Sequence, residues 1–259
     1  MQNIHEVLKK AKAEGKIDTD LLPWEKAETG RSEISNADSI ADAEHTISPE
    51  NFEVPPAFLR DIERTAENIK LLTYEEGQKI IGFASAQPQE GTSTLLAMIG
   101  YVLANQQSKV LMLDTQSRHP SLHRTFGKAL QPGLSEALRG ESPFEKVFQR
   151  ISDSELHLVT AGSPLAEDKM TPKLAKTLAT NRSKFDWIFL DLPPLVSYTE
   201  GLALSTLCDG VILVVGANQT RREIIETAID QLQRSNTNLL GCVLNRRRFY
   251  LPRGVYQRL

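Results

Sequence analysis

Cysteine is scarce in this sequence, and neither positive nor negative charge is in large excess. The chain contains two cysteines, Cys208 and Cys242, among 259 residues. Both lie in or beside apolar stretches, so we expect reduced core residues of a cytosolic protein rather than a disulfide framework. The formal net charge of −3 gives no global field that would attract nucleic acid, and we expect no nucleic-acid partner.

Long apolar runs are also missing. No stretch approaches the roughly 20 apolar residues that a membrane-spanning helix needs. The opening residues, MQNIHEVLKKAKAEGK, lack the apolar segment of a secretory signal. We expect a cytoplasmic protein that reaches the inner face of the plasma membrane only through a partner or a surface patch.

The first 56 residues differ in composition from the rest. Apolar residues recur at helical spacing from Ile4 to Ala11, which predicts a short amphipathic helix. Residues 25–55 are mostly polar and acidic, and such a stretch cannot bury enough apolar surface to offset its chain entropy. We interpret residues 1–56 as a helix and a partly disordered acidic linker, residues 57–248 as one domain, and residues 249–259 as a basic-aromatic tail.

Short apolar runs alternate with helical patterns from Lys79 onward. The expected strands are Lys79–Ser85, Lys109–Asp114, Leu156–Thr160, Trp187–Asp191, Gly210–Val215 and Leu239–Asn245. The expected helices are Ala57–Leu72, Thr94–Gln106, Leu134–Leu138, Glu145–Arg150, Pro172–Thr180 and one that ends at Ser235, opened by a capping box of Thr220 and Glu223. Apolar strands without polar alternation are typical of a parallel sheet covered on both faces. The sequence therefore predicts an α/β fold with helices on both faces of a parallel sheet, and with its ligand site at the carboxyl ends of the strands.

The turn after the first expected strand carries the pattern of a phosphate loop. Residues 86–94 read AQPQEGTST and open a helix. Backbone N–H groups of such a turn, together with the helix N-terminus, suit a bound anion. A complete phosphate loop reads GxxxxGK[ST], in which the lysine reaches the terminal phosphates and the hydroxyl holds Mg²⁺. Gly91 and Ser93 fit that pattern, but Thr92 stands where the lysine belongs.

Two acids end later strands of the predicted sheet. Asp114 is followed by TQSRHP, and Asp191 by Leu-Pro-Pro. An acid at this position beside a phosphate loop is where a ligand of Mg²⁺ belongs. The alternative for each is a strand-end aspartate that caps its own turn.

Taken in order, the segments EGTST, VLMLDTQSRHPSLHRTFG, GLSEALRG, WIFLDLPPLVSYTEG, CDGVILVV and LLGCVLNRRR are similar to the bacterial tyrosine kinases of capsule and exopolysaccharide synthesis. That family belongs to the MinD/ParA-like group of P-loop ATPases, and the resemblance spans about residues 79–248. It implies ATP or ADP and Mg²⁺ as cofactors, with binding weakened or absent here. The implied nucleotide-binding residues are Gln89, Glu90, Gly91, Thr92, Ser93, Thr94 and an adenine-contacting Asn245. The implied metal ligands are Ser93, Asp114 and Asp191.

The chain departs from this family at two charged positions. Thr92 replaces the phosphate-loop lysine, and Gln116 replaces the second acid of the family's DADxRRP motif. A charge-assisted hydrogen bond from lysine contributes roughly 1.5–3 kcal/mol, so its loss should weaken nucleotide binding roughly 10- to 150-fold. The family's kinases also phosphorylate a C-terminal tyrosine cluster, for which this chain offers only Tyr250 and Tyr256.

Three functions fit these features. The first is a kinase-like regulator or assembly subunit of exopolysaccharide export with weak or no kinase activity, which acts with a membrane-embedded co-polymerase (chain-length) protein and with self-association. The second is a working ATPase or tyrosine autokinase in which Asp114 and Asp191 are catalytic and Arg118 is a substitute cation. The third is a MinD/ParA-type switch that dimerises with nucleotide, although that group's second signature lysine has no counterpart at residues 87–89.

Overall fold

The computed structural model describes residues 56–74, 79–164 and 170–246 of the chain, without the side chains of residues 56–58 and 74. The expected N-terminal helix, the acidic linker, and the tail with Tyr250 and Tyr256 lie outside the described residues.

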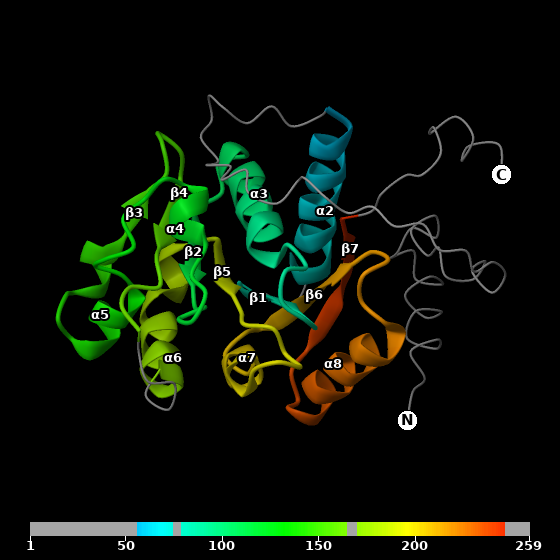
Figure 1. The fold of residues 1–259 in the computed structure, drawn as a ribbon. Helices are drawn as coiled ribbons and strands as arrows, with labels where there is room; N and C mark the ends of the chain where they lie inside the picture. Colours follow the sequence, from blue (N-terminus) through cyan, green and yellow to red (C-terminus); the bar gives the residue numbers. More distant parts are fainter. Residues whose placement is uncertain (1–55, 75–78, 165–169, 247–259) are drawn as a thin grey trace, which may run out of the picture. The chain divides into compact units, whose positions relative to one another are not determined.

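A seven-stranded sheet with the order β3-β4-β2-β5-β1-β6-β7 runs through the domain (Figure 1). Its strands are β1 (Ile80–Ser85), β2 (Val110–Asp114), β3 (Gln149–Arg150), β4 (Leu156–Val159), β5 (Trp187–Asp191), β6 (Gly210–Gly216) and β7 (Leu239–Asn245). Every neighbouring pair is parallel except β3, which runs antiparallel to β4 at one edge. The predicted parallel α/β sheet is confirmed.

Helices lie on both faces of this sheet. They are α2 (Pro56–Tyr74), α3 (Thr92–Asn105), α4 (Leu122–Thr125), α5 (Leu134–Arg139), α6 (Met170–Asn181), α7 (Thr199–Ser205) and α8 (Arg222–Arg234), with 3₁₀ turns η3 (Phe144–Val147) and η5 (Arg182–Lys184). Helices α2 and α3 lie together over one face, and α7 and α8 lie on the other (Figure 1). The short helices α4 and α7 were not among the elements that the sequence predicted.

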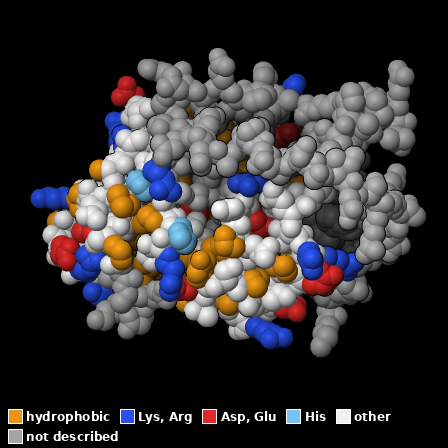
Figure 2. Space-filling model, in the orientation of Figure 1, with side chains coloured by type: hydrophobic (Ala, Val, Ile, Leu, Met, Phe, Trp, Pro, Cys, Tyr) orange, Lys and Arg blue, Asp and Glu red, His pale blue; other side chains and the backbone are white. Residues whose placement is uncertain are grey.

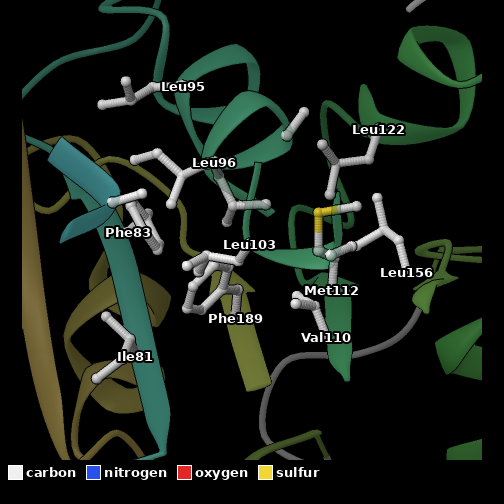
Figure 3. Close-up of a cluster of buried hydrophobic side chains, with 14 of the residues drawn as sticks. Ile81, Phe83, Leu95, Leu96, Leu103, Val110, Met112, Leu122, Leu156 and Phe189 are labelled. Carbon is white, nitrogen blue, oxygen red and sulfur yellow. The ribbon is translucent and has the colours of Figure 1, made fainter. Parts of the chain in front are cut away.

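The main core lies between α3 and the sheet. Ile81, Phe83, Met112 and Phe189 project from the strands toward Leu96 and Leu103 of α3 (Figure 3), and all six side chains are fully buried. The Phe83 and Phe189 rings meet edge to face with centroids 5.1 Å apart, a favoured aromatic geometry. Ile62, Ala66 and Ile69 of α2 join the same cluster. The helix predicted over Ala57–Leu72 therefore packs on the core through these three residues.

The helix predicted over Glu145–Arg150 is wrong. The chain there forms η3 and then the edge strand β3. The Phe148 ring packs edge-on against Phe144 and Phe185, with centroids 5.0 and 5.8 Å away. The Ile151 amide donates to the Leu156 carbonyl at 2.9 Å. The contact of Phe148 with Phe185 and the pairing of β3 with β4 therefore outweigh the local helical pattern.

The capping box predicted at Thr220 is also wrong. Helix α8 begins at Arg222, with Arg221 as its N-cap and no side-chain cap. The Thr220 hydroxyl instead donates to the Glu90 carboxylate in the loop after β1. Both cysteines are free, as expected, but Cys242 is exposed on the edge strand β7 rather than in the core.

Asp209, directly before β6, holds the starts of β1 and β6 together. Its Oδ2 accepts hydrogen bonds from the Lys79 and Ile80 amides at 2.8 Å each, and its Oδ1 accepts one from Arg182 at 2.8 Å.

We expect Asp209→Ala to lower the free energy of unfolding by about 1–3 kcal/mol, because two backbone amides lose their acceptor. Urea denaturation measures this, and Asp230→Ala, an exposed acid on α8, is the matched control. Equal stability of the two variants would contradict this role for Asp209.

Candidate functional site

The loop that joins β1 to α3, residues 86–91, has the backbone geometry of an anion-binding turn. Gln89 and Gly91 adopt left-handed conformations, with φ of 66° and 83°. Helix α3 begins directly after Gly91 and has no side-chain cap. Its first-turn N–H groups therefore lack intrahelical acceptors and, with the helix dipole, suit a negatively charged group. We call residues 86–94 the phosphate loop.

Glycine is required at position 91. Besides its positive φ, a Cβ at this position would clash with Nδ2 of Asn245. Asn245 ends β7, and its Nδ2 donates a hydrogen bond to the Glu90 carbonyl at 2.8 Å. The residue predicted to contact adenine thus braces the phosphate loop in this structure.

Glu90 is a site residue whose role the sequence did not reveal. Its side chain is buried, and Oε2 accepts a hydrogen bond from the Gln87 amide at 2.9 Å. Its Oε1 accepts bonds from the Gly216 amide at 2.9 Å and from the Thr220 hydroxyl. This carboxylate ties the phosphate loop to the end of β6 and to the turn before α8. No local pattern could have predicted it, because Gly216 and Thr220 lie more than 120 residues away.

Thr92 and Ser93 place two hydroxyls at the start of α3. Thr92 is buried, and its Oγ1 has no hydrogen-bond partner. Ser93 is half-buried, while Thr94 is exposed. A buried hydroxyl without a partner costs free energy unless a ligand satisfies it, so Thr92 points to a polar ligand at this loop.

Asp114 and Asp191 lie side by side at the ends of β2 and β5, as predicted. The two residues are paired in the parallel register, and both are fully buried. Oδ2 of Asp114 accepts hydrogen bonds from the Ser121 and Leu122 amides at 3.0 and 3.1 Å. Its Oδ1 accepts one from the Gln116 amide at 3.1 Å. Asp114 therefore caps the turn that leads into α4. Its metal-ligand or catalytic role stays a prediction, and these contacts do not support it.

Asp191 has a different environment. Its Oδ1 accepts a hydrogen bond from Nε2 of Gln116 at 2.9 Å, whereas its buried Oδ2 has no partner. The same Gln116 nitrogen donates to Oγ of Ser93 at 3.2 Å. Gln116, noted in the sequence only as a neutral replacement, thus joins the two residues predicted to hold Mg²⁺.

Both aspartates are harder to ionise than usual. Burial raises the pKa of Asp191 to about 8, and the negative charge of Asp114 contributes to that rise. The polar side chains of Ser93 and Gln116 beside this carboxyl lower its pKa and offset part of the rise. Burial also raises the pKa of Asp114 to about 6, in spite of the backbone amides that bind its carboxylate.

Two arginines lie near the candidate site. Arg118, the predicted substitute cation, donates to Oε1 of Glu200 through Nε at 3.2 Å and Nη2 at 3.0 Å. Its guanidinium also lies over the Tyr198 ring, 5.6 Å from the centroid. Arg246 was not among the site residues that the sequence predicted, but its Nε lies 3.4 Å from the place that a Cβ on Gly91 would occupy. Arg246 therefore flanks the phosphate loop, while Arg118 is engaged by Glu200.

Charged residues do not gather by sign on the described part of the face drawn in Figure 2. Basic and acidic side chains are interspersed with apolar ones on the face seen in Figure 2. Within the described ranges, no cluster of three or more His, Cys, Asp or Glu side chains could hold a metal ion. Among these same residues, no helix is long and apolar enough to cross a membrane.

A glycine-containing loop between a buried strand and a helix, with acids ending two neighbouring strands, defines a P-loop ATPase-like domain. The sequence matches the family model described as cellulose biosynthesis protein BcsQ over residues 79–234, more than half of the chain. The chain belongs to this family.

Several curated relatives are bacterial tyrosine kinases, which confirms the resemblance found in the sequence. Tyrosine-protein kinase YwqD of Bacillus subtilis is 29% identical over 181 residues, covering 69% of this chain and 76% of the relative. Tyrosine-protein kinase CpsD of Streptococcus agalactiae is 26% identical over 208 residues, covering 75% of this chain and 89% of the relative. The putative tyrosine-protein kinase EpsB of Ralstonia solanacearum is 28% identical over 186 residues, and the match spans only 24% of its length.

Solved structures show the same fold. The kinase domain of VpsO aligns with a TM-score of 0.66 and 27% identity, over 75% of this chain and 100% of that chain. The kinase domain of Escherichia coli tyrosine kinase ETK aligns at 0.70 and 19% identity, over 75% and 79%. The septum site-determining protein MinD of Pyrococcus horikoshii, complexed with Mg-ADP, aligns at 0.59 and 21% identity, over 70% and 76%.

We expect the stability of the chain to decrease as the pH rises from about 4 to about 8. Asp191, with a folded-state pKa of about 8, keeps a proton there that the unfolded chain, with an aspartate pKa near 3.9, has released. The folded state then binds more protons than the unfolded state, so the free energy of unfolding falls as the pH rises toward 8. Asp191→Asn should flatten this decline in urea denaturation at pH values near 6 and 8. An unchanged decline in the variant would rule out Asp191 as its source.

Proposed function

We propose that this chain is a nucleotide-binding, kinase-like subunit of exopolysaccharide or capsule biosynthesis and export, with weak or no tyrosine autokinase activity. The observation that carries the proposal is the composition of the phosphate loop. Its anion-binding backbone is retained, but the buried side chain at the lysine position is a neutral threonine.

The residues of the loop suit phosphate groups. The uncapped amides at the start of α3 and the unpartnered hydroxyl of Thr92 can donate hydrogen bonds to phosphate oxygens. A divalent cation fits less well, because Ser93 and Asp191 both face the amide nitrogen of Gln116. The proposal therefore includes nucleotide and no bound cation.

Weak catalysis follows from the same side chains. Phosphoryl transfer depends on positioned positive charge around the transferred group. Removing one preorganised donor of this kind costs about 10²–10³ in rate. Thr92 contributes no charge, and Gln116 cannot accept a proton as the acid of the related kinases could.

The proposed partner is a membrane-embedded polysaccharide co-polymerase, with self-association of this chain as a further contact. The relative ExoP of Rhizobium meliloti, 26% identical over 174 residues, is a succinoglycan biosynthesis transport protein. The match spans only 22% of the length of ExoP, and most of that protein lies outside it. We propose that this chain works in the cytoplasm and reaches the membrane through such a partner.

The central test is a titration with ADP of the natural chain beside Thr92→Lys. A restored charge-assisted hydrogen bond should tighten binding by roughly 10- to 150-fold, measured by calorimetry. Thr227→Lys, which adds the same charge at an exposed position on α8, is the matched control. Nucleotide that binds neither the natural chain nor Thr92→Lys would overturn the proposal of a nucleotide site.

Kinase activity is tested separately with Mg²⁺ and labelled ATP. We expect little or no label on Tyr250 and Tyr256 in the natural chain. Rapid labelling of either tyrosine would overturn the proposal of weak activity while leaving nucleotide binding intact.

A second candidate function is an active ATPase or autokinase with a substitute cation, and the position of Arg246 favours it. The Arg246 guanidinium lies beside Gly91, at the edge of the phosphate loop. The Arg118 guanidinium would first have to exchange its contact with Glu200 for one with phosphate. Arg246 is therefore the better-placed cation in this structure.

We expect Arg246→Ala to weaken ADP binding by about tenfold, because a charge-assisted hydrogen bond to phosphate is lost. Arg118→Ala should change the affinity much less. Arg222→Ala, which removes an exposed arginine paired with Glu226 on α8, controls for net charge. The opposite order, with Arg118→Ala abolishing binding or turnover and Arg246→Ala neutral, would return the role to Arg118.

A further inference from the structure

The Gln116 carboxamide lies where the site's oxygen ligands converge. Its nitrogen donates to Oγ of Ser93 in the first turn of α3, at 3.2 Å, and to Oδ1 of Asp191 at the end of β5, at 2.9 Å. Its own backbone N–H is fixed by Oδ1 of Asp114 at 3.1 Å. One amide group therefore links three segments of the site: the loop after β2, the start of α3 and the end of β5.

An amide nitrogen and a divalent cation make opposite demands on these oxygens. The –NH₂ group offers two hydrogens, and here each of them has an oxygen acceptor. Mg²⁺ needs oxygen ligands at about 2.0–2.1 Å in near-octahedral geometry, and an N–H donor cannot serve as one. A lone pair of Ser93 Oγ or Asp191 Oδ1 that accepts a hydrogen bond from Gln116 cannot also coordinate a cation. Without a metal, the bridge therefore engages Oγ of Ser93 and Oδ1 of Asp191, two oxygens of the side chains that the family pattern gives to the metal. It leaves Oδ2 of Asp191 without a partner.

Resting on the nucleotide site proposed above, we propose that Gln116 takes the place of the divalent cation and that this chain binds metal-free nucleoside phosphates. The amide holds Ser93 and Asp191 together in place of a cation. Affinity then depends on the loop amides, the Thr92 hydroxyl and Arg246, and not on magnesium.

The bridge leaves the anion-binding groups of the loop available. Gln116 contacts the Ser93 side chain, whereas the phosphate-binding donors are backbone N–H groups at the start of α3. Metal-free nucleotide carries more negative charge than its magnesium complex. The helix N-terminus and the exposed Arg246 beside Gly91 supply partial and full positive charge for it.

The experiment compares ADP binding in excess magnesium and in EDTA by calorimetry, for the natural chain and two variants. Gln116→Glu is isosteric and replaces the amide donor by an oxygen ligand, and Gln116→Met keeps the length while removing the donor. The natural chain should bind ADP equally in both solutions. Both variants should bind more tightly with magnesium than in EDTA, by about tenfold for Gln116→Glu. Gln233→Glu, which adds the same charge at an exposed position on α8, should behave as the natural chain.

A melting experiment without nucleotide provides a second readout. Gln116→Glu places a third carboxyl beside Asp114 and Asp191, so magnesium should raise its melting temperature, and it should leave that of the natural chain unchanged. Gln116→Met serves if the glutamate variant does not fold.

The outcomes separate the two proposals. Natural protein that binds ADP at least about tenfold more weakly in EDTA overturns the cation replacement and leaves the nucleotide site standing. Variants that fold but gain no magnesium dependence also overturn it. Absence of ADP binding by the natural chain and by both variants, in either solution, removes the nucleotide site and this inference with it.

Discussion

The parallel register of β1, β5 and β2 positions the whole candidate site. Asp191 of β5 pairs with Phe83 of β1 on one side and with Asp114 of β2 on the other. The chain beyond β5 continues this contact, since the Leu195 amide donates to the Ser85 carbonyl at 2.8 Å. Parallel strands that share a register end at the same edge of the sheet. The phosphate loop and the two buried aspartates therefore meet at one edge, above the apolar core beneath α3.

At two positions inside this site, a neutral side chain stands where a charged group is expected. A lysine and a metal ion would offset the buried carboxylates, but the chain supplies the hydroxyl of Thr92 and the amide of Gln116. In a low-dielectric environment a carboxyl without a full counter-charge keeps its proton to higher pH, and the raised pKa of Asp191 is consistent with this. The full positive charge that lies closest to the loop, among the contacts described above, is Arg246 at the surface.

The phosphate loop is held in shape by contacts with β6, β7 and the turn before α8. Glu90 joins it to the end of β6 and to the turn before α8, and Asn245 joins it to the end of β7. Such contacts hold the backbone amides in place before any ligand arrives, which lowers the ordering cost of binding. This preorganisation is independent of the missing lysine, so the loop can lose much of its charge and still present its amides.

The sequence by itself determined the α/β architecture, because continuous apolar runs and helical periodicity reflect burial directly; β5 and β7 have the predicted bounds, Trp187–Asp191 and Leu239–Asn245. It also identified Thr92 and Gln116 as neutral substitutions. Only the tertiary structure decided what those residues contact, that Thr220 binds Glu90 instead of capping α8, and that Arg246 flanks Gly91. Each of these contacts joins residues far apart in the chain, and the packing of strand ends against one another, rather than any local pattern, brings them together.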